Sequence, residues 1–150
     1  MKLSNYLMLI VTLFFIACSK ESTNTPTTKT IEELLTEKAW KVDEIRLQQA
    51  NGVMQYYKRG GGANNVNYDS DSLKFNVNNT GTYYYSGSTY TTTWNFINAE
   101  KSKMTLVINY GTPLTLNLEN INITQTYFRY SQYLIAGINS YLASCTRTQN

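Results

Sequence analysis

The sequence has 150 residues, and 13 Lys and Arg against 10 Asp and Glu give a formal net charge of +3. Charged residues make up 15% of the chain and form no basic cluster, so no nucleic-acid partner is expected. Histidine is absent, which excludes Ser-His-Asp and Cys-His catalysis and any histidine metal ligand. We therefore expect no catalytic residues, no metal site and no cofactor, and we expect that the protein is not an enzyme.

Residues 1–17 have the features of a secretory signal peptide. Lys2 supplies a short positive region, and an apolar run over residues 6–16 follows it. This run is shorter than the roughly 20 residues that a membrane-spanning helix needs. Ala17 is the small residue that cleavage requires before the next position, Cys18.

The segment Phe15-Ile16-Ala17-Cys18 resembles the lipobox of bacterial lipoproteins. This resemblance implies that Cys18 carries a lipid and becomes the mature N-terminus. The alternative is an ordinary secretory signal in which the cysteine is a coincidence. We expect an exported protein that a lipid anchors in the outer membrane, on either its periplasmic or its surface face.

Cleavage before Cys18 leaves 133 residues with a net charge of +2. Residues 18–29 contain no large apolar side chain after the cysteine, which is typical of a disordered tether. If Cys18 is acylated, Cys145 stays a single thiol, which we interpret as a small buried apolar residue.

A single domain is expected over residues 30–150. Thr30 and Glu33 have the spacing of a capping box, which predicts one short helix of about eight residues. The rest of the chain has the alternating apolar pattern of short strands separated by turns. The first strand changes phase, which predicts a bulge near Asp43 and Glu44.

Asn51-Gly52 predicts a hairpin turn, and residues 59–71 form a Gly- and Asn-rich loop. Five further strands are expected around 73–77, 82–86, 90–96, 104–108 and 114–118. A phase switch after residue 119 leaves the register open there. Residues 127–130 read as strand. The apolar spacing over residues 134–142 would also suit a helix, but Gly137 argues against one, so we expect a loop and then a closing strand over residues 140–147.

These elements predict an all-β fold, an antiparallel up-and-down barrel of eight to nine strands with a short N-terminal helix that plugs or flanks one end. The order of several short motifs resembles the lipocalin-like domains of small Bacteroidota lipoproteins, over roughly residues 30–150. The motifs are Trp40-Lys41-Val42, Asp71-Ser72-Leu73-Lys74-Phe75, Thr80-Gly81-Thr82-Tyr83 and Trp94-Asn95-Phe96. The resemblance implies an eight-stranded barrel whose ligand is not assigned.

If the barrel has a cavity, inward aromatic residues would bind a small apolar or amphipathic ligand there. The candidates are Trp40, Tyr83, Tyr85, Trp94 and Phe96. The alternative is that these side chains fill the interior, because eight strands leave only just enough room for side chains. Trp40 in particular suits a core position at the bottom of the barrel.

A second hypothesis is a structural or interaction lipoprotein whose outer surface recognises a protein or a glycan. Tyrosines and asparagines that would form such a surface are Tyr56, Tyr57, Tyr68, Tyr84, Tyr90, Asn64, Asn65 and Asn67. Asp69 and Asp71 lack the glycine and distal glutamate of a calcium-binding EF-hand, so we interpret them as turn formers. The sequence leaves the oligomeric state open.

Overall fold

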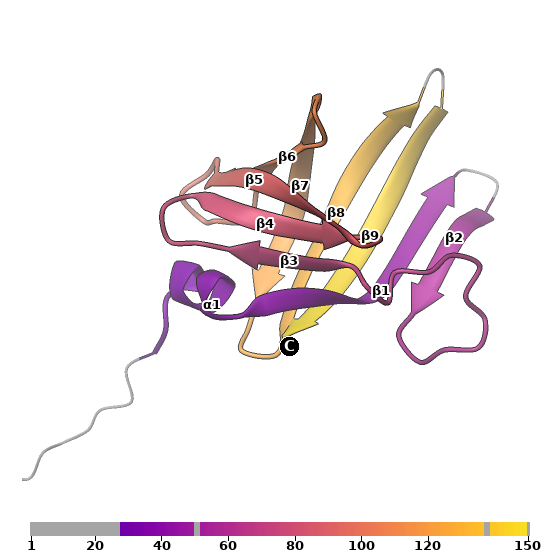
Figure 1. Cartoon of the computed structure of the whole chain (residues 1–150), viewed down its shortest axis with the longest axis horizontal. Helices are drawn as coiled ribbons and strands as arrows, with labels where there is room; N and C mark the ends of the chain where they lie inside the picture. Colours follow the sequence, from indigo (N-terminus) through magenta and orange to yellow (C-terminus); the bar gives the residue numbers. More distant parts are fainter. Residues whose placement is uncertain (1–27, 50–51, 137–138, 150) are drawn as a thin grey trace, which may run out of the picture.

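The structure is a computed structural model that describes residues 28–49, 52–136 and 139–149 (Figure 1). The signal peptide of residues 1–17, the candidate lipid site Cys18 and nearly all of the tether of residues 18–29 lie outside the described residues. Asn51 of the candidate Asn51-Gly52 turn also lies outside the described residues, although the two strands that the turn joins are described.

One helix and nine antiparallel strands make up the described domain. The chain runs through each strand into its neighbour, and β1 pairs with β9 to close the ring. Their bounds are α1 Ile31–Glu37, β1 Ala39–Gln49, β2 Gly52–Lys58, β3 Ser72–Phe75, β4 Thr80–Tyr85, β5 Ser88–Phe96, β6 Met104–Asn109, β7 Pro113–Ile123, β8 Tyr127–Ala136 and β9 Asn139–Gln149.

The closed ring has eight strands, and β2 is an additional strand that pairs with β1. The first part of β1 pairs with β3, while its second part pairs with β2, so β2 continues the wall where the short β3 is missing. This arrangement confirms the predicted up-and-down barrel of eight to nine strands with a short N-terminal helix. The predicted bulge is also confirmed, because the register of β1 against β9 shifts between Val42 and Glu44.

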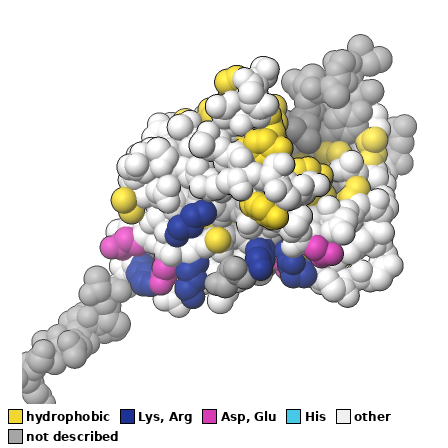
Figure 2. All heavy atoms as spheres, viewed as in Figure 1, with side chains coloured by type: hydrophobic (Ala, Val, Ile, Leu, Met, Phe, Trp, Pro, Cys, Tyr) yellow, Lys and Arg dark blue, Asp and Glu magenta, His cyan; other side chains and the backbone are white. Residues whose placement is uncertain are grey.

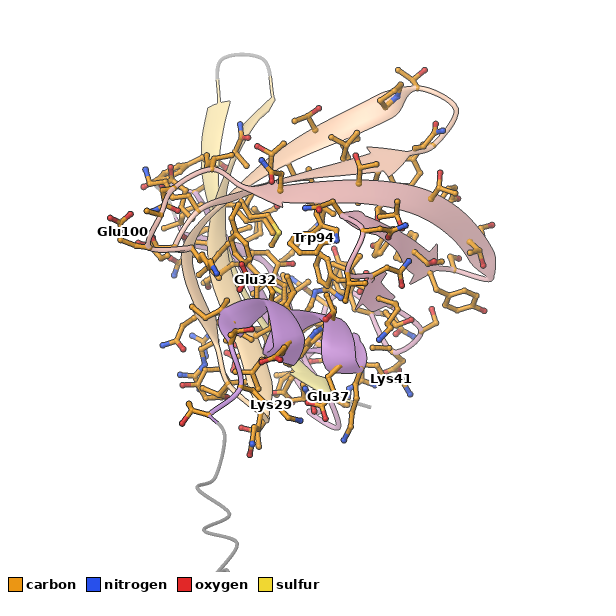
Figure 3. The ribbon with its side chains drawn as sticks, turned by 90° about the vertical axis from the view of Figure 1, so that its left-hand side faces the viewer. Lys29, Glu32, Glu37, Lys41, Trp94 and Glu100 are labelled. Atoms are coloured by element: carbon orange, nitrogen blue, oxygen red, sulfur yellow. The ribbon has the colours of Figure 1, made fainter. Side chains whose placement is uncertain are left out.

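Helix α1 closes one end of the barrel. Its capping box is present: the Thr30 hydroxyl accepts from the backbone N–H of Glu33, and the Glu33 carboxylate accepts from the backbone N–H of Thr30. Leu35 is fully buried, and its carbonyl accepts a 2.8 Å hydrogen bond from the indole of Trp40. Figure 3 shows α1 lying across this end, with Trp94 inside the ring of strands above it.

The core lies directly behind α1 and consists mainly of aromatic rings. Phe75 lies edge-on to Trp94 and to Phe128, with ring centroids 5.6 and 5.8 Å apart, and Trp40 lies edge-on to Phe128 at 5.8 Å. Such edge-to-face pairs add stabilisation beyond the burial of their area. This half of the barrel interior is therefore filled by side chains.

Two predictions about the strands are wrong. Residues 131–136 were predicted to form a loop, but β8 continues to Ala136 and pairs with β9 along its whole length. Gln132 faces inward and is buried, so a polar residue stands where the alternation would require an apolar one. Val77 was predicted to continue the inner face of β3, but the strand ends at Phe75 and Val77 is 86% exposed.

The phase switch near residue 119 has a local cause. Asn120 has a φ of 53°, and the register of β7 against β8 shifts between Glu119 and Asn122. Asparagine tolerates this left-handed backbone conformation better than most residues. The irregularity returns Ile123 to the core side of the sheet, where it is buried.

A candidate ligand cavity at the open end of the barrel

The barrel end opposite α1 contains a cavity of about 170 Å³. Tyr110 and Leu114 line it while being 42% and 45% exposed, so its mouth lies beside the turn between β6 and β7. An engineered apolar cavity of roughly 150 Å³ holds a benzene molecule. The cavity therefore has room for a single small ring, and it is well below the ~300–1,000 Å³ of pockets for drug-sized ligands.

Most of the cavity wall is apolar. The wall residues belong to strands on both sides of the barrel, so a bound molecule would be surrounded rather than held on one face. The apolar lining includes Leu73, Leu106, Ile108, Leu114, Leu116 and Ala143.

The inner end of the cavity is polar and holds a buried ion pair. Arg147 Nη1 lies 2.5 Å from Asp71 Oδ1, and the two side chains are only 6% and 1% exposed. The hydroxyl of Tyr83 donates a hydrogen bond to the other carboxylate oxygen of Asp71. Because both oxygens of Asp71 have partners, its charge is compensated where water cannot reach it.

Arg147 makes two further hydrogen bonds. Its Nη1 donates to the backbone carbonyl of Trp40 at 3.3 Å, and its Nε donates to the hydroxyl of Tyr130 at 3.2 Å. Burial opposes the charge of Arg147, but the surrounding groups, Asp71 among them, keep the pKa of its guanidinium above the ordinary value. The arginine therefore stays charged.

Two other groups at this end stay protonated. Burial raises the pKa of the Tyr130 hydroxyl and the pKa of the Cys145 thiol above their ordinary values. Cys145 is buried and free, as the sequence suggested for a small buried residue. A protonated thiol is a poor nucleophile, so Cys145 contributes to the cavity wall as a weakly polar surface.

The strands place this cluster through simple alternation. Asp71 stands two residues before Leu73, on the same side as Leu73 and Phe75, while Tyr83 pairs directly with Leu73. On β9, Arg147 follows Cys145 by two residues and shares its inward face. The register of the barrel then brings Asp71 and Arg147, 76 positions apart in the chain, into contact.

The loop of residues 59–71 holds Asp71 in place. Arg59 donates from Nε and Nη2 to the carbonyl of Val42, at 2.8 and 2.5 Å. The hydroxyl of Tyr57 donates to Asp69 at 2.6 Å, and burial together with this carboxylate raises the pKa of Tyr57 to about 12. The loop is thus tied to β1 and β2 and completes the wall beside the cavity.

The five sequence-predicted ligand residues do not lie together. Tyr83 lines the cavity, and Tyr85 stacks on it at the rim, with ring centroids 6.1 Å apart and planes inclined by 5°. Trp40 and Trp94 are buried in the core behind α1, and Phe96 packs against that core. These last three are not among the residues that line the cavity. Trp94 and Phe96 instead border a groove between α1 and the β5–β6 turn.

Sequence reasoning missed the polar cluster. Asp71 was interpreted as a turn former, and Arg147 and Tyr130 were not singled out. The available signal was the position of each charge in the alternation, because Asp71 is in phase with Leu73 and Arg147 is in phase with Cys145. A charge in phase with core residues indicates a buried, paired group.

The outer face of the open half carries few formal charges, and Arg46, which stands between the cavity-lining Ile45 and Leu47 on β1, is one of them. Residues 47–57, 82–93, 107–117 and 131–146 contain no Asp, Glu, Lys or Arg. On the face seen in Figure 2, most of the charged side chains lie in the lower part, and most of the hydrophobic ones lie above them. The exposed apolar and aromatic residues of this half are Val53, Met54, Tyr84, Tyr85, Tyr110, Leu114 and Tyr133.

Among residues 28–49, 52–136 and 139–149, no group of three or more Cys, Asp or Glu side chains is placed to hold a metal ion. No helix in the described part of the chain has the length and apolar character that a membrane crossing needs. Models of known protein families do not match this sequence, and neither do curated protein sequences.

Proposed function

We propose that this protein is a non-enzymatic, lipid-anchored, lipocalin-like barrel of the cell envelope that binds a small, mainly apolar molecule in the open end of its barrel. The observation that carries the proposal is the cavity of about 170 Å³, which has apolar walls and a polar inner end. Ligand sites in proteins commonly combine apolar walls with a few placed polar groups.

A matched pair of proteins tests the ligand-binding part. Ala143 lines the cavity from β9, so Ala143→Phe would fill the space that a ligand needs. Titration calorimetry with ethylbenzene should give saturable binding to the unmodified protein and none to this variant. Absence of binding to the unmodified protein would contradict the proposal, and so would equal binding to both.

Anchoring is tested separately from binding. The lipobox-like segment ending at Cys18 predicts that cells given a labelled fatty acid, such as palmitate, incorporate it into this protein. Cys18→Ala should abolish the label, whereas Cys145→Ala should leave it unchanged. Label that persists in Cys18→Ala would contradict lipid attachment at this residue.

We also infer a second candidate function, recognition of a neutral glycan by the outer surface of the open half, which has few charges. Exposed tyrosine rings, surrounded by Thr, Asn and Gln without formal charges, suit sugar rings and hydroxyl groups. Tyr85 and Tyr110, which are 38% and 42% exposed and both contact the ring of Tyr83, are the clearest contributors. Tyr85→Ser with Tyr110→Ser should then abolish retention on a neutral envelope polysaccharide, while the far-UV circular dichroism spectrum stays that of the folded barrel. Unaltered retention would count against this candidate.

A further inference from the structure

The polar end of the cavity restricts the chemistry of the ligand, an inference that rests on the ligand-binding function proposed above. Arg147 uses Nη1 and Nε for Asp71, Trp40 and Tyr130. Among the residues that the structure describes, the hydrogen bonds to oxygen that Arg147 makes do not involve its other amino group, Nη2, and the thiol of Cys145 is a further, weak partner of the guanidinium. In this part of the chain, the fully buried polar side-chain atoms without a partner are Thr92 Oγ1 and Gln149 Nε2. Nη2 is not among them, so it keeps some accessible surface on a residue that lines the cavity.

An unpartnered donor on a buried arginine needs an acceptor. Arg147 is 5% exposed and lines the cavity, so an acceptor for this group, a water molecule or a ligand oxygen, would lie in the cavity. Hydrogen bonds to a charged donor are stronger than bonds between neutral groups. A ligand that presents an oxygen to Nη2 would therefore gain more than a ligand of the same shape without one.

The charge balance decides which kind of acceptor fits. Asp71 and Arg147 are the charged residues among the described cavity lining, and they neutralise each other. A carboxylate ligand would add a second negative charge that no other lining cation compensates. Taking such a charge out of water is costly unless it is paired. A neutral oxygen acceptor avoids this cost.

We propose that the cavity selects uncharged molecules of about one ring that carry a carbonyl-type oxygen, with Arg147 Nη2 as the donor to that oxygen. The volume of about 170 Å³ limits the enclosed part of the ligand to this size. Asp71 acts as a specificity residue in this arrangement, because its charge cancels that of Arg147 and so excludes carboxylates.

Three probes of similar size test this selection: ethylbenzene without an acceptor, acetophenone with a neutral carbonyl, and benzoate with a carboxylate. Calorimetric titration of the unmodified protein should show acetophenone binding about tenfold more tightly than ethylbenzene, as one hydrogen bond to a charged donor would give. Benzoate should bind at least about tenfold more weakly than acetophenone.

Asp71→Asn keeps the shape of the side chain but leaves the charge of Arg147 uncompensated. The preference between the two oxygen-bearing probes should then reverse in favour of benzoate. The double variant Asp71→Asn/Arg147→Met removes both charges together, so it should misfold less readily than a variant that leaves one charge buried without its partner. In this variant the advantage of acetophenone over ethylbenzene should disappear.

The possible failures are distinguishable. If the unmodified protein binds benzoate as tightly as acetophenone, or does not distinguish acetophenone from ethylbenzene, the selection proposed here is wrong while the binding function stands. The selection is also wrong if the double variant keeps the full preference for acetophenone. If none of the three probes binds the unmodified protein, both the selection and the binding function are contradicted.

Discussion

Asp71 and Arg147 sit inside the barrel, where the desolvation of each charge is costly. Their direct contact and the hydrogen bonds from Tyr83 and to Tyr130 compensate for that cost. The pair is consequently sensitive to the loss of one member. Loss of both members at once should be tolerated much better, since neither charge is then left alone.

Replacing Arg147 alone tests this dependence. Arg147→Met leaves the Asp71 carboxylate buried without its cation and should lower the free energy of unfolding by about 3–5 kcal/mol. The double variant Asp71→Asn/Arg147→Met should recover a substantial part of that loss. Urea unfolding of the three proteins measures the difference. A double variant that is as unstable as the single one would show that the charges are not coupled.

The buried tyrosine hydroxyls make stability depend on alkaline pH. Burial, together with the Asp71 carboxylate, raises the pKa of Tyr83 above its ordinary value, and burial raises that of Tyr130. An unfolded tyrosine ionises near pH ~10. The folded state favours the neutral form, so this stabilisation is complete below about pH 10 and is lost as the pH rises further.

The free energy of unfolding should therefore fall between roughly pH 10 and pH 11.5, beyond the fall that exposed groups produce. Tyr83→Phe removes one of the responsible groups and should make the fall shallower. Urea unfolding at a series of pH values checks this. Identical pH dependence in the two proteins would contradict the role of Tyr83.

At the scale of single residues, the sequence predicts the burial of apolar and aromatic side chains better than the burial of charged ones. Tyr83 was predicted to face inward because it alternates with its neighbours, and it does. Asp71 and Arg147 were missed because a single charge is costly to bury and is therefore expected at the surface. Each of the two is buried only because the other is its partner, and the register of the barrel is what brings them together.

At the scale of elements, β4 packs tightly against its neighbours β3 and β5 at Gly81. A Cβ at this position would meet the backbone carbonyl of Lys74 and would lie 2.6 Å from the hydroxyl oxygen of Thr92. The backbone of β3 and the buried Thr92 leave little room for adjustment. Glycine is required here for the close approach of the neighbouring strands.

Gly81→Ala should therefore destabilise the protein by about 1–3 kcal/mol, as overpacking does. Gly62 is the matched control, because a Cβ there meets nothing within 4 Å. Gly62→Ala should change stability by no more than about 0.5 kcal/mol. Thermal unfolding of both variants provides the comparison. Similar melting temperatures for the two would contradict the tight packing of β4.

Local signals predicted some elements well. The capping box at Thr30 located the start of α1, and the phase change in β1 located its bulge. The second half of β8 was missed because Gln132 faces the cavity instead of the packed core. A strand that lines a cavity with polar groups does not follow the alternation of a strand that covers a core, and only its pairing with β9 identifies it.

For the molecule as a whole, the two barrel ends have different roles. Helix α1 and the aromatic core fill one end, whereas the other end holds the cavity and has an uncharged rim. The described chain enters at the α1 end, so a lipid on Cys18 would attach to the domain through its closed end (Figure 1).

The sequence predicted the barrel because consecutive hairpins with one apolar face have few other ways to close. It did not predict how the interior is divided. Aromatic residues from both halves have the same alternation, and whether they fill the space or leave a cavity depends on side-chain volumes summed around the ring. Tyr83 lies at the boundary between the two halves.

Crystals of the protein soaked in bromobenzene test most directly whether the open end is a binding site. The anomalous signal of bromine locates the probe without assumptions about its pose. We expect a peak inside the cavity, among Ile108, Tyr83 and Tyr130. An empty cavity, with bromine found only in the groove beside α1, would contradict the assignment of the open end as the ligand site.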